Sequence, residues 1–310
     1  MYRRVTVPLD GSRQSEHALR WAVTIARNAG CVLDLVHAAF PPPAATELAG
    51  AALWQGRALD DAEAAARERL HSLAAEAATL GIRVEPIIID RPVPDALIDH
   101  IQESGTDLIV MTTHARSRLE HLLLGSVAAS VIRHSNVPVL LVRPDEGLPA
   151  IASPVTVERV LVPLDGSAFA REILPPVSEL AILMQAELTL LSVLQPVVAL
   201  ATATLDTGPN LLMPLSNAPS SEGLAPSLSD LDRAAESLKS ATDLVVRTAV
   251  VAHGRPAQAI VDYAEHHGMD LIAMTTHGRG ALKRLVAGSV SEAVIRTFGR
   301  PMLVVRPNIS

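Results

Sequence analysis

Two Gly-Ser pairs in this 310-residue chain have the residue types and the setting of a phosphate site. Gly125-Ser126 and Gly288-Ser289 each follow a predicted apolar strand by a loop and open a predicted helix. Such a pair exposes backbone N–H groups, a hydroxyl and the positive end of the helix dipole. A glycine near the preceding strand end, such as Gly278, lets the backbone approach an anion closely. We therefore expect both pairs to suit a phosphate group.

An aspartate ends another predicted strand in each half of the chain. Asp10 and Asp165 lie in matching Pro-Leu-Asp-Gly-Ser runs. A carboxylate is badly placed for phosphate, but it accepts hydrogen bonds from an amino group or a hydroxyl, as on adenine or ribose. Each feature by itself also has an ordinary structural explanation: Asp-Gly is a common turn, Gly-Ser a common helix start, and a lone histidine usually a hydrogen-bonded loop residue.

The chain repeats itself. Residues 5–12 return at 160–167, and residues 107–144 return at 270–307 with 21 of 38 positions identical. The two offsets differ by eight residues, which fit in the Pro-, Ser- and Asn-rich stretch 195–229. We therefore expect two copies of one domain, residues 1–145 and 158–310, joined by a linker at 146–157.

Within each half, short apolar strands alternate with helices. Ser12 is expected to cap the first helix, and Pro175-Pro176 to delay its counterpart in the second half. Strands that are apolar on both faces are typical of parallel sheets covered by helices. The pattern predicts the α/β class, with two tandem doubly wound domains, each a five-stranded parallel sheet flanked by four helices. In the first half, the expected strands are 5–9, 32–38, 82–89, 108–112 and 137–142, and the later helices 58–80, 94–104 and 126–134.

Composition excludes several other classes. With 26 basic and 33 acidic residues, the formal charge of −7 leaves no basic nucleic-acid footprint. The single cysteine, Cys31, excludes an intramolecular disulfide and a cysteine-cluster metal site, and suits a reducing compartment. We find no targeting segment and no stretch of about 20 uninterrupted apolar residues. A cytoplasmic protein with no membrane contact is expected.

The chain resembles tandem members of the universal stress protein family over nearly all of both halves. The resemblance is carried by the Val-Pro-Leu-Asp-Gly-Ser runs, by Asp-Leu-Ile-x-Met-Thr-Thr-His, by Gly-Ser-Val and by the closing Pro-x-Leu-x-Val-Arg-Pro. The nucleotide-binding branch of that family has the motif Gly-x2-Gly-x9-Gly-Ser/Thr. Both Gly-Ser pairs match its end. Gly278 matches its second glycine, Ala115 replaces that glycine in the first copy, and Thr112 and Thr275 replace the first glycine.

The resemblance implies strand order 3-2-1-4-5 and an ATP site over the ends of strands one and four, with Mg²⁺ possible on the phosphates. It implies adenine near the aspartate and the end of strand two, and phosphates on the Gly-Ser helix start. The residues carried over are, in the first copy, Pro8, Leu9, Asp10, Ala38, Met111, Thr112, His114, Ala115, Gly125, Ser126 and Val127. In the second copy they are Pro163, Leu164, Asp165, Val193, Met274, Thr275, His277, Gly278, Gly288, Ser289, Val290 and Ser291.

The two copies depart from the motif unequally. Ala115 places a Cβ where the backbone needs a positive φ, a conformation that alanine adopts poorly. Ala128 lacks the hydroxyl that Ser291 offers to a phosphate. Gly254-Arg255-Pro256 resembles the family's Gly-x-Pro, whereas the first copy has Arg91-Pro92-Val93. The second site is therefore expected to bind better. Loop cations beside the sites are Arg116 and Arg118, then Arg279, Lys283 and Arg284.

Three functions remain open at this point. The leading one is an ATP-binding stress-response regulator without dedicated catalysis. A slow ATPase would need a positioned base, for which His114 or His277 is available, but no Walker lysine motif or nucleophile elbow is present. A scaffold that binds no nucleotide is favoured by the missing first glycines. No metal site is expected, because His266 and His267 are adjacent on a helix and point apart.

Strand five of each copy suggests the partner surfaces. Residues 137–142 and 302–305 would be apolar edge strands, and exposed edges of this kind invite pairing. In the family this strand mediates dimer contacts. The resemblance therefore implies that the two copies pair as an internal pseudo-dimer, with a homodimer of chains also possible.

Overall fold

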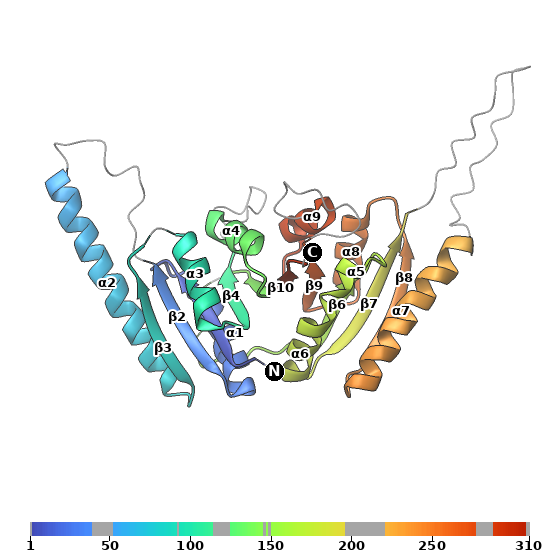
Figure 1. The fold of residues 1–310 in the computed structure, drawn as a ribbon, viewed down its shortest axis with the longest axis horizontal. Helices are drawn as coiled ribbons and strands as arrows, with labels where there is room; N and C mark the ends of the chain where they lie inside the picture. Colours follow the sequence, from blue (N-terminus) through green and yellow to red (C-terminus); the bar gives the residue numbers. More distant parts are fainter. Residues whose placement is uncertain are drawn as a thin grey trace, which may run out of the picture.

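The structure is a computed structural model of the 310-residue chain (Figure 1). It describes residues 2–38, 52–91, 93–113, 125–144, 147, 150–195, 221–276 and 288–307. Strands and helices alternate within each copy apart from the consecutive helices α5 (Ala168–Arg171) and α6 (Leu174–Met184), which confirms the α/β class.

The first copy follows the expected order of elements. Its strand β5 begins after Pro138, two residues later than expected, and its second helix begins six residues earlier. The elements are β1 (Arg4–Leu9), α1 (His17–Ala29), β2 (Val32–Ala38), α2 (Ala52–Ala78), β3 (Arg83–Ile89), α3 (Asp95–Ser104), β4 (Leu108–Thr112), α4 (Ser126–His134) and β5 (Val139–Val142).

The second copy repeats this order with one change near its start. The elements are β6 (Arg159–Pro163), α5 (Ala168–Arg171), α6 (Leu174–Met184), β7 (Glu187–Leu194), α7 (Ser221–Ala241), β8 (Val246–Ala252), α8 (Pro256–His266), β9 (Leu271–Thr275), α9 (Ser289–Thr297) and β10 (Met302–Val305). Two helices, α5 and α6, replace the single α1 of the first copy.

The starts of these helices correct two expectations. Ser12 does not cap α1, which begins only at His17 after a turn; the Ser12 hydroxyl instead accepts from the Ser15 N–H at 3.3 Å. Its counterpart Ser167 does cap α5. The second copy therefore has five helices among the described residues, not four. Pro175 and Pro176 lie in the first turn of α6, where a helix needs no N–H donor, so the helix restarts there.

All ten described strands form one sheet. Its order is β3-β2-β1-β4-β5-β10-β9-β6-β7-β8, so each copy has the order 3-2-1-4-5 that the family resemblance implies. Pairing is parallel within each copy, while β5 and β10 are antiparallel, with Leu140 opposite Leu303. The sheet is therefore continuous and mixed, rather than two separate parallel sheets. Figure 1 shows α2 and α7 at its two outer ends.

Helices cover both faces of the sheet. Along β2, Leu33 and Leu35 belong to one apolar cluster and Val36 to the other, because successive side chains of a strand point to opposite faces. The first cluster receives side chains from α1, α2, α6 and α7, and the second from α3, α4, α8 and α9. Burial on both faces explains why these strands are almost wholly apolar.

Contacts outside the sheet also join the two copies. The Tyr2 hydroxyl donates to the Pro176 carbonyl at 3.1 Å, and Arg143 donates from Nη2 to the Ile295 carbonyl at 2.6 Å. Arg143 thereby adds a positive charge near the C-terminal end of α9, where the helix dipole favours a cation. Within the described ranges, we find no helix both apolar enough and long enough for a membrane crossing.

Candidate functional site

β1 and β4 are parallel neighbours in the middle of the first copy, as β6 and β9 are in the second, so their carboxyl ends lie at the same edge of the sheet. The ladder pairs only the first residues of these strands, Val5 and Thr6 with Leu108 and Ile109 in the first copy. In the sheet, β2 and then β3 lie on one side of β1, whereas β4 and then β5 lie on its other side. The strand order therefore reverses between β1 and β4. Open α/β sheets bind ligands at the carboxyl ends of strands at such a reversal.

The aspartate at the end of the first strand builds a tight turn in both copies. Asp10 Oδ1 accepts from the Ser12 N–H at 2.9 Å and from the Ser12 hydroxyl at 2.6 Å. Asp165 makes the same two bonds with Ser167, at 2.9 and 2.6 Å. The glycine between them has a φ near +80° in each copy, which favours glycine. Both aspartates are exposed.

The Gly-Ser pairs begin α4 and α9, as expected. Gly125 and Gly288 are the N-cap residues, and their carbonyls accept the first helical bonds, from Ala129 N at 2.8 Å and Glu292 N at 2.9 Å. Ser126 and Ser289 are exposed. The first-turn N–H groups of both helices therefore begin at the molecular surface, where an anion can reach them.

The two helix starts differ beneath this surface. In the second copy, Gly288 N donates to the Thr276 carbonyl, and Ser291 Oγ lies 2.7 Å from that same oxygen and 3.0 Å from the Gly288 carbonyl oxygen. Ser291 is only 3% exposed, so its hydroxyl holds the helix start against the end of β9 rather than reaching a surface ligand. The corresponding residue, Ala128, is equally buried and has no hydroxyl.

Thr113 is a further candidate site residue that sequence reasoning missed. It directly follows β4 and is 5% exposed, and its Oγ1 has no hydrogen-bond partner among the described residues. A buried hydroxyl without a partner costs free energy, and this one lies at the end of β4, the strand that precedes α4. The available signal was the second threonine of the Met-Thr-Thr-His run, which both copies share.

The other expected residues divide between the two faces of the sheet. Those that gather on the α3–α4 face, or its counterpart α8–α9, are Ala38, Met111, Val127, Val193, Met274 and Val290. Leu9 and Leu164 belong to the opposite apolar cluster, so the structure does not bring their side chains to these residues. Pro8 and Pro163 are half-buried, and Thr112 and Thr275 are buried. His114, Ala115, His277, Gly278, the loop cations and Pro92 lie outside the described residues.

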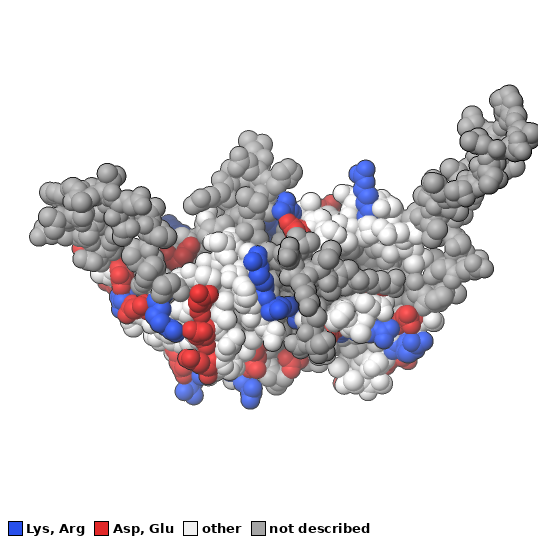
Figure 2. Space-filling view, turned by 45° about the horizontal axis from the view of Figure 1, so that its top comes forward, with Lys and Arg blue, Asp and Glu red and all other residues white. Residues whose placement is uncertain are grey.

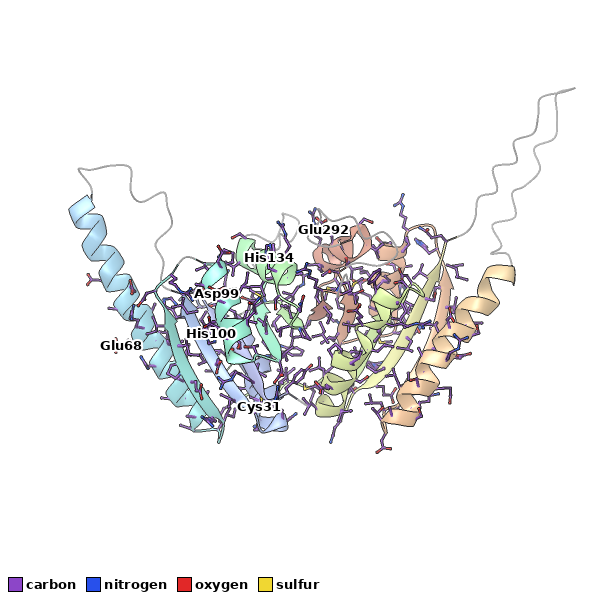
Figure 3. All side chains as sticks on the ribbon, in the orientation of Figure 1. Cys31, Glu68, Asp99, His100, His134 and Glu292 are labelled. Atoms are coloured by element: carbon purple, nitrogen blue, oxygen red, sulfur yellow. The ribbon has the colours of Figure 1, made fainter. Side chains whose placement is uncertain are left out.

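Charge near the two sites is mixed. Figure 2 shows acidic and basic side chains interspersed on the face in view. Glu292, on the first turn of α9 (Figure 3), is an anion at a proposed phosphate site, but Arg296 one turn on pairs with it. In the described part of the chain, no three His, Cys, Asp or Glu side chains group as metal ligands.

A cluster of charged side chains around the buried Asp34 lies in the first copy, nearer the amino ends of the strands. Asp34 Oδ1 is 2.5 Å from Arg4 Nη1, and its Oδ2 is 3.4 Å from His100 Nε2; His100 is labelled on α3 in Figure 3. Arg4 also contacts Glu85 at 3.0 Å. Burial by itself would raise the pKa of Asp34, but His100 and Arg4 outweigh it and hold that pKa below its ordinary value. The second copy has Thr189 in place of Asp34.

The comparison with protein families decides the relationship. The profile described as "Universal stress protein family" matches residues 1–143 and again 156–306. The chain belongs to the universal stress protein family. It carries two domains of that family in tandem.

Some curated relatives match the whole chain, and others match one half of it. Universal stress protein Rv2005c of Mycobacterium tuberculosis is 28% identical over 312 residues, covering 97% of this chain and 96% of the relative. Universal stress protein YxiE of Bacillus subtilis is 31% identical over 148 residues, covering 46% of this chain and all of the relative. A solved universal stress protein from Archaeoglobus fulgidus superposes with a TM-score of 0.66 at 22% identity over 99% of this chain and 97% of that one, which establishes the shared fold.

Proposed function

We propose that this universal stress protein is a stress-response regulator that binds ATP at the carboxyl ends of β1 and β4, and again at those of β6 and β9. The observation that carries the proposal is the pair of helix starts, α4 and α9, each opened by an N-cap glycine and an exposed serine beside the strand reversal. A helix start in this position binds phosphate through backbone N–H groups and the helix dipole.

The surrounding residues supply the remaining chemistry of an adenine nucleotide site. Asp10 and Asp165 offer exposed carboxylates for ribose or adenine donors. Ala38 and Met111 in the first copy, and Val193 and Met274 in the second, provide an apolar wall on the same face as the helix starts. Phosphates would lie on Gly125-Ser126 and Gly288-Ser289, with Mg²⁺ offsetting their charge.

The unpartnered hydroxyl of Thr113 fits such an occupant. It lies at the strand end that precedes α4, and it can donate to or accept from a polar ligand group. In the second copy, Thr276 follows β9 at the same place and its carbonyl already accepts from Gly288 N and Ser291 Oγ. Nothing in this arrangement calls for a catalytic residue, so we propose binding without dedicated catalysis.

We further propose that the second copy binds ATP more tightly. Its helix start is held in place by Ser291 and Thr276 before any ligand arrives, and preorganised donors bind at a lower entropic cost. The negative charge of Glu292 would weaken phosphate binding at the second copy, but Arg296 pairs with Glu292 and offsets that charge.

We also infer the organisation of the whole chain. Residues 1–145 and 158–310 would be the two domains, 146–157 the linker, and the β5–β10 pairing the seam of an internal pseudo-dimer. Cys31 is a free, buried thiol, as suits a protein of the reducing cytoplasm.

Release of bound nucleotide tests the function. The purified protein is soaked in MgATP, separated from free nucleotide, denatured in acid and analysed by chromatography. We expect ATP in the supernatant, and much less from the double variant Gly125→Val, Gly288→Val. No nucleotide after soaking would contradict the proposal and favour a scaffold. ADP that accumulates with time in the wild type only would instead indicate slow hydrolysis.

A further inference from the structure

The ten-stranded sheet ends in two edge strands, β3 in the first copy and β8 in the second. Within the described residues, β8 has a partner on one side only, β7, in a register that runs from Leu188 opposite Val246 to Leu194 opposite Ala252. An edge strand of this kind presents a row of unpaired backbone N–H and C=O groups, which can template pairing with another strand.

Two bonds show which backbone groups of β8 face outward. Leu188 N donates to the Val245 carbonyl and His253 N donates to the Leu194 carbonyl, both at 2.9 Å. Residues 245 and 253, and every second residue between them, therefore face β7. The N–H and C=O groups of Val246, Thr248 and Val250 must point away from β7, toward the open edge.

The other edge of the sheet is blocked at its centre. Pro86 lies opposite Leu35 in β3, and Thr248 lies opposite Leu190, the counterpart of Leu35, in β8. Proline has no N–H, and within sheets it occupies edge positions where that donor would face away from the sheet. Pro86 therefore removes the central outward donor of β3, whereas Thr248 retains it. The two copies therefore differ at a central position of the outer edge, where only the second retains its backbone donor.

Helix α7 packs against β8, and the Thr248 hydroxyl donates to Asp232 of α7 at 3.0 Å, but the strand's own side chains protect its edge little. Arg247 is its one charged residue, and it is paired with Glu187 at 3.1 Å. Ala249 and Val251 are uncharged and half-buried. Val245, directly before the strand, is 49% exposed, and only Ile182 is another large apolar side chain exposed to that degree in the described part of the chain. Charges and prolines are what usually prevent edge-to-edge association, and β8 has no proline.

We propose that two copies of this protein associate through antiparallel pairing of their β8 strands. The occupant is a second copy because this chain already pairs edge strands antiparallel at β5 and β10, and a β8–β8 contact continues the same sheet. A two-fold axis through Ala249 makes the contact self-complementary. It places Arg247 opposite Val251 of the second copy, so no like charges face each other.

The proposed contact is modest in size. One pair of seven-residue strands buries less surface than a permanent dimer does, so the association is weak and concentration-dependent.

Sedimentation equilibrium of the full chain over a concentration series tests the proposal. The central pair in this register is Ala249 with its own symmetry mate, so Ala249→Lys and Ala249→Glu each oppose like charges across the axis. We expect each variant alone to dissociate on the order of tenfold more readily than wild type, and an equimolar mixture to recover the dimer. Thr248→Pro, which copies Pro86, should also yield monomer.

Arg83→Glu on the exposed end of β3 is the matched control, and it should leave the dimer unchanged. Circular dichroism confirms that every variant is folded. The proposal is overturned if wild type remains monomeric throughout the series. It is equally overturned if the Ala249 variants dimerise as wild type does, since the association would then use another face.

Discussion

The Ser291 hydroxyl lies 2.7 Å from the carbonyl oxygen of Thr276, and this contact joins the first turn of α9 to the end of β9. The first copy has Ala128 at the corresponding position. The two candidate phosphate sites therefore begin from the same Gly-Ser pair but differ in how firmly the helix start is held.

Removing this hydroxyl should loosen the second site. We expect Ser291→Ala to lower the free energy of unfolding by about 1 kcal/mol, because the Thr276 carbonyl loses a buried partner. The variant should also weaken nucleotide binding at the second copy. Urea unfolding measures the first effect and calorimetric titration with MgATP the second. The reverse change, Ala128→Ser, should strengthen binding at the first copy; tighter binding in Ser291→Ala would contradict this reasoning.

The two Gly-Ser pairs should contribute unequally to nucleotide occupancy. We expect Gly288→Val to release more bound nucleotide than Gly125→Val, because its helix start is the preorganised one and a branched side chain there blocks the approach of a phosphate. Nucleotide per chain after acid release is the measurement. Equal losses from the two variants would show that the sites are equivalent.

Asp34 should make the stability of the first copy depend on acid pH. A carboxyl group whose pKa is lowered in the folded state stabilises the fold above its unfolded pKa of about 3.9, and the stabilisation is lost as pH falls through the folded value. At pH 7, Asp34→Asn should lower the free energy of unfolding by about 1.5–3 kcal/mol, because a buried charged hydrogen bond with Arg4 is lost.

The difference between Asp34→Asn and wild type should shrink as pH falls from 7 to about 3, because protonation of the unfolded carboxyl group below its pKa of about 3.9 progressively removes the stabilisation. Urea unfolding at the two pH values provides the comparison. Thr189→Asn, at the corresponding position of the second copy, is the control and should show no such pH dependence. A difference that stays constant with pH would mean that Asp34 acts through its shape alone.

Cys31 should be unreactive in the folded protein. It is 6% exposed, and burial raises the pKa of its thiol to about 11, so almost no thiolate is present at pH 8. We expect a disulfide reagent to label it only at the rate at which the protein opens, with full labelling in denaturant. An Ala29→Cys variant provides the reactive control, because residue 29 is the last residue of α1, two positions before Cys31, and is partly exposed. Rapid labelling of wild type without denaturant would show that the segment between α1 and β2, which contains Cys31, opens readily.

Local features were predictable from sequence because they depend on neighbouring residues. The Asp-Gly-Ser turns need a glycine with positive φ and a serine two residues after the aspartate, and both lie within the motif. The Gly-Ser helix starts are equally local. Ser12 shows the limit: its motif matches that of Ser167, yet α1 begins only at His17 because a turn fills the intervening residues.

Contacts between distant segments could not be predicted in the same way. The burial of Thr113 without a hydrogen-bond partner depends on the whole fold and not on its neighbours in sequence. Asp34 becomes a buried, paired carboxylate only when Arg4 and His100, from two other elements, reach it. The register between β1 and β4 also decided that Leu9 and Met111 point to opposite faces of the sheet.

By itself the sequence determined that this protein is one α/β domain used twice, because hydrophobic periodicity and turn chemistry are repeated along the chain. The family resemblance implied that the copies pair through their fifth strands, but only the tertiary structure decided that β5 and β10 pair antiparallel within one continuous sheet that has two unequal outer edges. The physical reason is that strand pairing between copies depends on which edges remain open after each domain has packed.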